Sequence, residues 1–164
     1  MDRISASTTI AMPQAHVFEY LADIANHAEF TDHYLVDWHL TRENPYGTGA
    51  GARFRVKAPL RRFSWADMTF SELQPPARIV ESGWGGKYNR VRMLGTYTLS
   101  PGPEDSTSVE YILQTEPAML SDKLLARLGG RAWSARQAAK AMRRLRSILE
   151  DDGKRGPRAS VAGG

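Results

Sequence analysis

Six segments with the composition of β-strands follow one another through the middle of the sequence. They span residues 34–42, 52–58, 62–73, 78–84, 88–100 and 107–116. Turn-forming residues separate them, most clearly in the run Asn44-Pro45-Tyr46-Gly47. Strands that are joined by short turns pair in antiparallel fashion. The sequence therefore predicts an antiparallel sheet.

Helical segments flank this predicted sheet on both sides. Residues 4–12 predict a first strand, and from Pro13 to about residue 32 the pattern predicts two short helices. Residues 119–151 predict one long helix, which Gly129-Gly130 interrupts with a kink or a loop. The apolar residues at helical spacing in that segment are Leu124, Leu128, Ala135, Met142, Leu145 and Leu149. This order of elements predicts an α+β fold.

One face of the predicted sheet is apolar. In the second segment, Phe54 and Val56 lie on one face, whereas Arg53, Arg55 and Lys57 lie on the other. An apolar face must be covered, and only the long C-terminal helix is large enough to cover a sheet of about seven strands. We therefore expect the sheet to curve around that helix.

Length and composition limit the remaining possibilities. The 164 residues suit one domain, predicted over residues 1–151, followed by a disordered basic tail over 152–164. The chain has no cysteine, which excludes disulfides and thiolate metal sites. There is neither an apolar run long enough to span a bilayer nor a secretory leader, so a cytoplasmic location is expected.

Several local motifs resemble those of one known superfamily. They are residues 15–26 (AHVFEYLADIAN), 72–80 (ELQPPARIV), 95–99 (GTYTL), 107–109 (TSV) and 145–150 (LRSILE). In these motifs and in the order of its elements, the chain resembles the helix-grip, START-like (SRPBCC) superfamily. That superfamily includes the plant pollen allergens and the polyketide cyclase/dehydratase and lipid-transport group. The resemblance covers about residues 4–151.

The resemblance implies a deep cavity between the sheet and the long helix. Members of the superfamily use this cavity for lipids, sterols, quinones and polyketides, and few of its branches are enzymes. The expected function is therefore to bind a lipid, a polyketide-like molecule or another hydrophobic small molecule, in a carrier or sequestering role. The alternative is a polyketide cyclase/aromatase or dehydratase-like enzyme that uses general acid/base residues in the same cavity. A further alternative is a protein-binding role.

Large aromatic residues and small helix residues are the predicted cavity lining. Rigid rings suit the wall of an apolar pocket, and small side chains on the facing helix leave volume for a ligand. The predicted ligand-binding residues are Trp38, Phe54, Trp65, Trp84, Met93, Tyr97, Tyr111, Leu128, Ala132, Trp133, Ala135 and Ala139. Ala138 is also placed near this helix face. The aromatic residues are equally compatible with core packing, and alanine is simply a good helix former.

Candidate residues for metal binding or proton transfer are few. The only histidines are His16, His27, His33 and His39, and their spacing matches no metal motif. We therefore expect no metal and no cofactor. His33 or His39, at the mouth of the cavity, is a candidate general base. No constellation of residues demands catalysis, so the catalytic residues are unknown.

Two strand regions leave the direction of charged side chains open. Trp65 and Met68 cannot both point inward in a regular strand, and a bulge between them would reconcile the two. Asp67, which lies between them, is expected to face solvent, but if buried it could act as an acid or base. Arg90 and Arg92 are expected outside, although a shift of register would place them in the cavity as anion anchors.

Charge is distributed unevenly along the chain. Residues 1–50 contain two basic and seven acidic residues, whereas the whole chain has a net charge of +4. The long helix and the tail contain many of the basic residues. A solvated helix face is the favoured interpretation, and weak contact with an anionic membrane is a second one. We expect no nucleic-acid partner and a monomer or homodimer.

Overall fold

The computed structural model describes residues 2–59, 62–125 and 129–162. Within these ranges, strands and helices follow the predicted order, with one additional short strand near the C-terminus. The strands are β1 (Asp2–Ile10), β2 (Leu35–Leu40), β3 (Gly51–Ala58), β4 (Arg62–Gln74), β5 (Arg78–Gly85), β6 (Val91–Pro101), β7 (Thr107–Pro117) and β8 (Ser160–Val161). The helices are α1 (Gln14–Leu21), α2 (His27–Thr31), α3 (Leu120–Leu125) and α4 (Arg131–Asp151), with 3₁₀ turns η1 (Ile24–Asn26), η2 (Lys87–Asn89) and η3 (Pro103–Asp105).

The strands form one curved, open sheet in the order β1-β7-β6-β5-β4-β3-β2-β8. Consecutive strands from β2 to β7 pair in antiparallel fashion, and β1 pairs with β7 across the ends of the chain. The predicted α+β class and the antiparallel sheet of seven strands are confirmed. The eighth strand, β8, pairs in parallel with β2.

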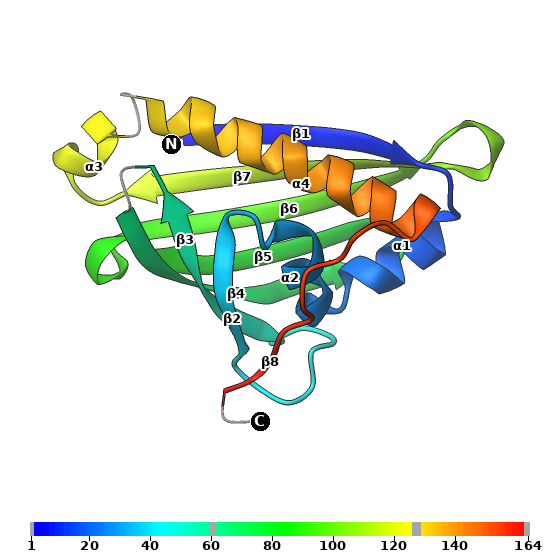
Figure 1. Ribbon diagram of the computed structural model, residues 1–164, viewed down its shortest axis with the longest axis horizontal. Coiled ribbons are helices and arrows are strands. Elements are labelled where there is room, and N and C mark those ends of the chain that lie inside the picture. Colours follow the sequence, from blue (N-terminus) through cyan, green and yellow to red (C-terminus); the bar gives the residue numbers. More distant parts are fainter. Residues whose placement is uncertain (1, 60–61, 126–128, 163–164) are drawn as a thin grey trace.

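Helix α4 lies across one face of this sheet, with α1 and α2 near its C-terminal half (Figure 1). Its inner face contributes Met142, Leu145 and Ile148 to the hydrophobic core, where they join residues of the sheet such as Ile10 and Val109. Burial of this apolar stripe stabilises the helix far more than the propensity of its residues does. The prediction that the sheet curves around the long helix is confirmed.

Strand β4 places its bulge later than the sequence predicted. Ala66, Met68 and Phe70 are all buried on the inner face, so the alternation is regular through this part of the strand. The pairing with β5 shifts only between Phe70 and Glu72. Without a bulge between Trp65 and Met68, Trp65 must point to the opposite face from Met68.

The C-terminal segment differs from the disordered tail that the sequence predicted. It turns back after α4 and runs past α2 to β2 (Figure 1). The backbone N–H of Gly156 donates to the Glu29 carbonyl at 2.8 Å, and that of Ala159 donates to the Ala25 carbonyl at 3.1 Å. These bonds join segments far apart in the sequence, so no local pattern in a glycine-rich tail could predict them.

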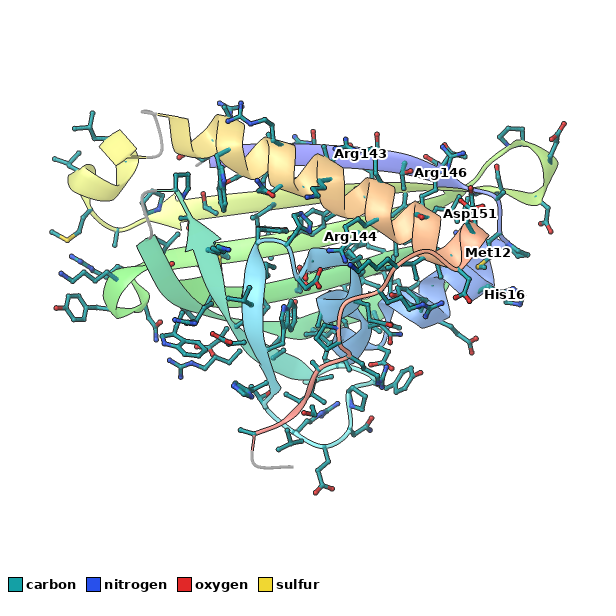
Figure 2. All side chains as sticks on the ribbon, viewed as in Figure 1. Met12, His16, Arg143, Arg144, Arg146 and Asp151 are labelled. Atoms are coloured by element: carbon teal, nitrogen blue, oxygen red, sulfur yellow. The ribbon has the colours of Figure 1, made fainter. Side chains whose placement is uncertain are left out.

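Arginines attach this tail and α4 to the helical segment at the front of the molecule. Arg158 forms an ion pair with Asp23, with 2.6 Å between Nη1 and Oδ2, and the Asp23 side chain is buried. Arg144 pairs with Asp32 and donates to the Glu29 carbonyl. Figure 2 shows Arg144 on the side of α4 that faces α2, whereas Arg143 and Arg146 lie on the other side of the helix. Among the described helices, none combines the length and apolar character needed to cross a membrane.

Candidate ligand-binding cavity

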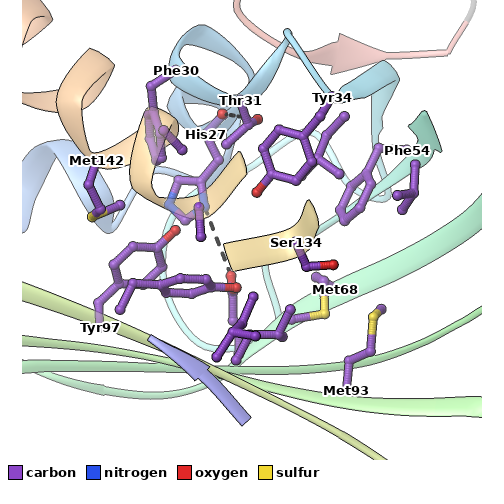
Figure 3. Close-up of a pocket in the computed structure, with 18 of the residues that line it drawn as sticks. His27, Phe30, Thr31, Tyr34, Phe54, Met68, Met93, Tyr97, Ser134 and Met142 are labelled. Atoms are coloured by element: carbon purple, nitrogen blue, oxygen red, sulfur yellow. Dashed lines mark hydrogen bonds and ion pairs between the residues drawn. The ribbon is translucent and has the colours of Figure 1, made fainter. Parts of the chain in front are cut away.

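A partly open cavity of about 200 Å³ lies between the sheet, α2 and α4. Most of its wall is apolar or aromatic, and side chains from both layers point into the same space (Figure 3). The lining residues are Ile4, Ile24, His27, Phe30, Thr31, Tyr34, Leu35, Trp38, Phe54, Val56, Met68, Glu81, Met93, Tyr97, Tyr111, Leu113, Thr115, Trp133, Ser134, Ala138, Ala141 and Met142. The sheet and the long helix thus leave a void beside the packed core.

Six of the twelve residues predicted to line a cavity do line this one. They are Trp38, Phe54, Met93, Tyr97, Tyr111 and Trp133. Four of their rings pack in two tilted pairs. The ring centroids are 4.5 Å apart in each pair, and the interplanar angle is 32° for Trp38–Phe54 and 36° for Tyr97–Tyr111. Paired rings of this kind form flat, rigid walls.

Two of the predicted residues lie outside the cavity, so the prediction that they line it is wrong. Trp65 and Trp84 are 38% and 52% exposed. Trp65 lies on the outer face of β4, on the opposite side from the buried Met68. Trp84 lies on the outer face of β5, because it is an odd number of positions from the inward-facing Glu81. Arg53 lies over the Trp65 ring, with its guanidinium carbon 5.1 Å from the ring centroid. The outer face of the sheet thus keeps this ring in contact with solvent and cations.

The predicted face of the long helix is displaced from the one that lines the cavity. Ala132 is exposed, Ala135 and Ala139 are half-buried, and none of the three is in the lining. Ala138, which the sequence analysis also placed near this face, does line the cavity, together with Ala141. Helix α4 begins at Arg131, and the residues that it contributes to the lining are Trp133, Ser134, Ala138, Ala141 and Met142. Leu128 lies outside the described residues.

A buried polar cluster, which the sequence analysis missed, forms one end of the cavity. It consists of Glu81 on β5, Tyr111 on β7 and His27 on α2. The Tyr111 hydroxyl donates to Oε1 of Glu81 at 3.2 Å, and Oε2 is 3.9 Å from Nδ1 of His27 (Figure 3). Nε2 of His27 lies 2.8 Å from the Leu21 carbonyl. Since a carbonyl only accepts, Nε2 carries the proton and Nδ1 of the neutral ring faces Glu81.

Burial favours the neutral forms of both His27 and Glu81. Desolvation lowers the pKa of His27 to about 4. Desolvation also raises the pKa of Glu81 to about 7, although the hydrogen bond from Tyr111 works in the opposite direction. The separation of 3.9 Å is within the range of an ion pair, but between these two pKa values neither group is charged. Burial likewise raises the pKa of Tyr97 and Tyr111.

Strand alternation contained the information needed to find Glu81. Ile79 is fully buried in β5, and a period of two places Glu81 on the same inward face. Gly95, opposite Glu81 on β6, provides the space for its side chain. A Cβ atom on Gly95 would lie 2.5 Å from Oε1 and 2.7 Å from Cγ of Glu81. A glutamate paired with a glycine on an otherwise apolar strand face therefore predicts a buried carboxyl.

Replacing Gly95 with alanine is expected to displace the Glu81 side chain. Overpacking of this kind costs about 1–3 kcal/mol of the free energy of unfolding, which urea denaturation measures. The loss should shrink in the double variant Gly95→Ala/Glu81→Ala, because the conflicting side chain is gone. Equal losses from Gly95→Ala with and without Glu81 would show that the glycine serves the backbone rather than this side chain.

The other charged candidates lie away from the cavity lining. His33 is half-buried beside Arg144 and Gln137, and burial lowers its pKa. Neither His33 nor His39 lines the cavity, and neither do Asp67, Arg90 or Arg92. Asp67 faces Arg53 at 3.8 Å, with both side chains largely in solvent. In the part of the chain that the structure describes, no three histidine, aspartate or glutamate side chains are grouped to hold a metal.

Solved structures share this architecture. The KanY protein, solved by NMR, superposes with a TM-score of 0.71 at 16% identity, over 93% of this chain and 100% of that one. A START superfamily protein from Mycobacterium smegmatis gives 0.66 at 13% identity, over 92% and 99% of the two chains. The chain has the helix-grip fold. DynU16, from the dynemicin biosynthetic locus, has the same fold, with a TM-score of 0.64 at 18% identity over 94% of this chain and 49% of that one.

The helix-grip fold accounts for the position of the cavity. The curved sheet wraps around α4, and the cavity lies between the strands and the N-terminal half of this helix. At these identities the likeness concerns the fold, which suits a ligand-binding cavity but specifies no ligand. No protein-family model and no curated protein matches the sequence.

Proposed function

We propose that this helix-grip protein binds a small hydrophobic molecule in the cavity and acts as its carrier or sequesters it. The observation that supports the proposal is the wall itself, where aromatic and aliphatic side chains from the sheet and from α4 enclose an unfilled space. A void of this kind costs stability unless something fills it. A ligand that loses about 250 Å² of apolar surface gains about 6 kcal/mol from its transfer out of water, against which the cost of association is set.

The size of the cavity restricts the ligand further. Drug-sized ligands occupy pockets of roughly 300–1,000 Å³, whereas an apolar cavity of roughly 150 Å³ holds one benzene molecule. The present cavity has about 200 Å³. It therefore suits a molecule of one or two rings, or one end of a longer molecule that protrudes through the open side, better than a complete two-chain lipid.

Calorimetric titration with 2-methoxynaphthalene tests the proposal. We expect saturable binding with a negative change in heat capacity, since apolar surface is buried. Native mass spectrometry of the protein as purified is a second measurement. A co-purified apolar molecule would support the carrier role. Failure of the probe to bind up to its solubility limit, together with an empty purified protein, would contradict the proposal.

One observation favours the enzyme alternative. A buried carboxyl with a pKa of about 7 is suited to proton transfer at neutral pH, as a cyclase, aromatase or dehydratase would require. Glu81 has such a carboxyl, and Tyr111 is hydrogen-bonded to it. Recovery of a bound molecule with unchanged mass supports the carrier, whereas a product of lower mass by one water would support the dehydratase. We favour the carrier, because a single acid–base group defines no reaction.

A further inference from the structure

The polar cluster contains hydrogen-bond acceptors that lack a donor. Oε1 of Glu81 accepts from Tyr111, whereas among the described residues nothing donates to Oε2. Its neighbour at 3.9 Å, Nδ1 of His27, also has no donor there, and that distance is too long for a hydrogen bond between the two. When the carboxyl is ionised, both atoms are acceptors that face each other.

Among the residues that the structure describes, no cation compensates the Glu81 carboxyl. The side chain is nearly inaccessible, with 5% of the residue exposed, and within the described residues no lysine or arginine forms an ion pair with it or lowers its pKa. A buried carboxylate is unfavourable when one of its oxygens has no donor. A donor supplied by the ligand would remove this cost, and the cost recurs whenever the ligand leaves.

The walls beside the cluster are flat and aromatic, with additional hydroxyls. The tilted ring pair Tyr97–Tyr111 forms one wall, and the pair Trp38–Phe54 lies further along the cavity. Tyr97 is 3% exposed, and its hydroxyl makes no hydrogen bond to any residue that the structure describes. Figure 3 shows Tyr34 and Tyr97 on opposite sides of the space beside His27. The polar end of the cavity thus lies against aromatic surfaces.

We infer that Glu81 is the polar anchor of the cavity, and that the ligand is a flat apolar molecule of one or two rings with a hydrogen-bond donor, a hydroxyl or an amine, that bonds to Oε2. This inference rests on the proposed function and names its ligand class. The aromatic walls contact the rings, and the donor occupies the position between Oε2 and Nδ1 of His27. A ligand without a donor fills the same space but leaves the carboxyl unpartnered.

Three naphthalenes of similar size test the inference. 2-Naphthol carries a hydroxyl donor, 2-(aminomethyl)naphthalene a cationic donor, and 2-methoxynaphthalene no donor. The titrations are made at pH 8, above the pKa of about 7 of Glu81, where the carboxyl is ionised. We expect at least one of the two donors to bind wild-type protein about tenfold more tightly than 2-methoxynaphthalene there, because hydrogen bonds to charged groups are the strong ones. The tighter of the two identifies the hydroxyl or the amine as the preferred group.

Two variants connect this preference with Glu81. In Glu81→Leu, both donors should bind within about twofold of 2-methoxynaphthalene, while binding of 2-methoxynaphthalene itself persists. Glu81→Gln keeps the shape of the side chain but removes the charge, so any preference for the amine should disappear there as well. Glu110→Leu, at an exposed position of β7, is the matched control and should retain the preference. Thermal melting verifies that each variant is folded.

The outcomes separate this inference from the proposed function. If all three naphthalenes bind wild-type protein equally, or if the donor preference survives in Glu81→Leu, then Glu81 is not the anchor although the cavity binds ligands. If none of the three binds, the proposed function fails and the anchor fails with it. A preference in wild-type protein that is lost in Glu81→Leu and kept in Glu110→Leu supports the inference.

Discussion

Replacing Ala138 with phenylalanine is expected to abolish ligand uptake while the protein stays folded. Ala138 is 2% exposed and lines the cavity from α4. The added ring is the size of a benzene molecule, which by itself fills an apolar cavity of roughly 150 Å³, and the whole cavity has about 200 Å³. Little space then remains for a ligand. We expect Kd for 2-methoxynaphthalene to rise at least about 30-fold, which is about 2 kcal/mol.

The exposed Ala132 provides the matched control on the same helix. Ala132→Phe adds the same ring outside the cavity, so its Kd should stay within about twofold of the wild-type value. Both variants are compared by near-ultraviolet circular dichroism and thermal melting, because overpacking of a well-filled site costs about 1–3 kcal/mol. If Ala138→Phe is folded and still binds the probe as wild-type protein does, the ligand lies elsewhere.

The fold could be predicted from local patterns because each pattern has a local cause. The turn at Asn44-Pro45-Tyr46-Gly47 lies between β2 and β3, and the alternation around Phe54 places that residue inward as predicted. Strand order follows from short connections. These features depend on neighbours within a few residues, so a single sequence contains them.

The site was harder to predict, because it depends on which face each helix and strand turns inward and on contacts between residues far apart in the sequence. Ala138 and Ala139 are neighbours on α4, but only Ala138 lines the cavity, because one step along a helix turns the side chain by about 100°. The position of a single bulge in β4 decides whether Trp65 is a cavity wall or a surface ring. The inward face of α4 and the position of the bulge in β4 do not follow from composition. Both are set by packing against other elements.

The C-terminal segment was also mispredicted because its structure depends on residues far away in the sequence. Its composition is that of a disordered segment, but Arg158 pairs with Asp23, which lies 135 positions earlier in the chain, and Ala159 donates to the Ala25 carbonyl. The interactions that order it are contributed by the folded domain. The segment it contacts includes Ile24, His27 and Phe30, which line the cavity, so the tail supports one wall of the site.

Replacing Glu81 with glutamine is expected to change how stability depends on pH. In the wild-type protein burial raises the pKa of Glu81 from about 4.5 to about 7. The folded state therefore retains a proton that the unfolded chain releases between these values. The resulting stabilisation is fully present below about pH 4.5 and is lost as the pH rises through 7, a change of about 3 kcal/mol at 1.36 kcal/mol for each pKa unit.

His27 produces the opposite dependence. Burial lowers its pKa from about 6.5 to about 4, so its contribution is present above about pH 6.5 and is lost as the pH falls through 4. In wild-type protein, Glu81 lowers and His27 raises the free energy of unfolding as the pH rises from about 4.5 to 6.5, so the two contributions oppose each other. In Glu81→Gln only the slope of His27 remains in this cluster, and stability should rise steadily over that interval.

Urea denaturation of both proteins from pH 4 to pH 8 measures the difference. Any cost of burying the glutamine does not vary with pH, so only the change in the difference between the two stability curves matters. Relative to wild-type protein, Glu81→Gln should gain about 3 kcal/mol between pH 4.5 and pH 7.5. If the two curves of unfolding free energy against pH stay parallel over this range, the carboxyl ionises normally and is solvated. A solvated carboxyl is incompatible with a buried anchor that lacks a donor until the ligand binds.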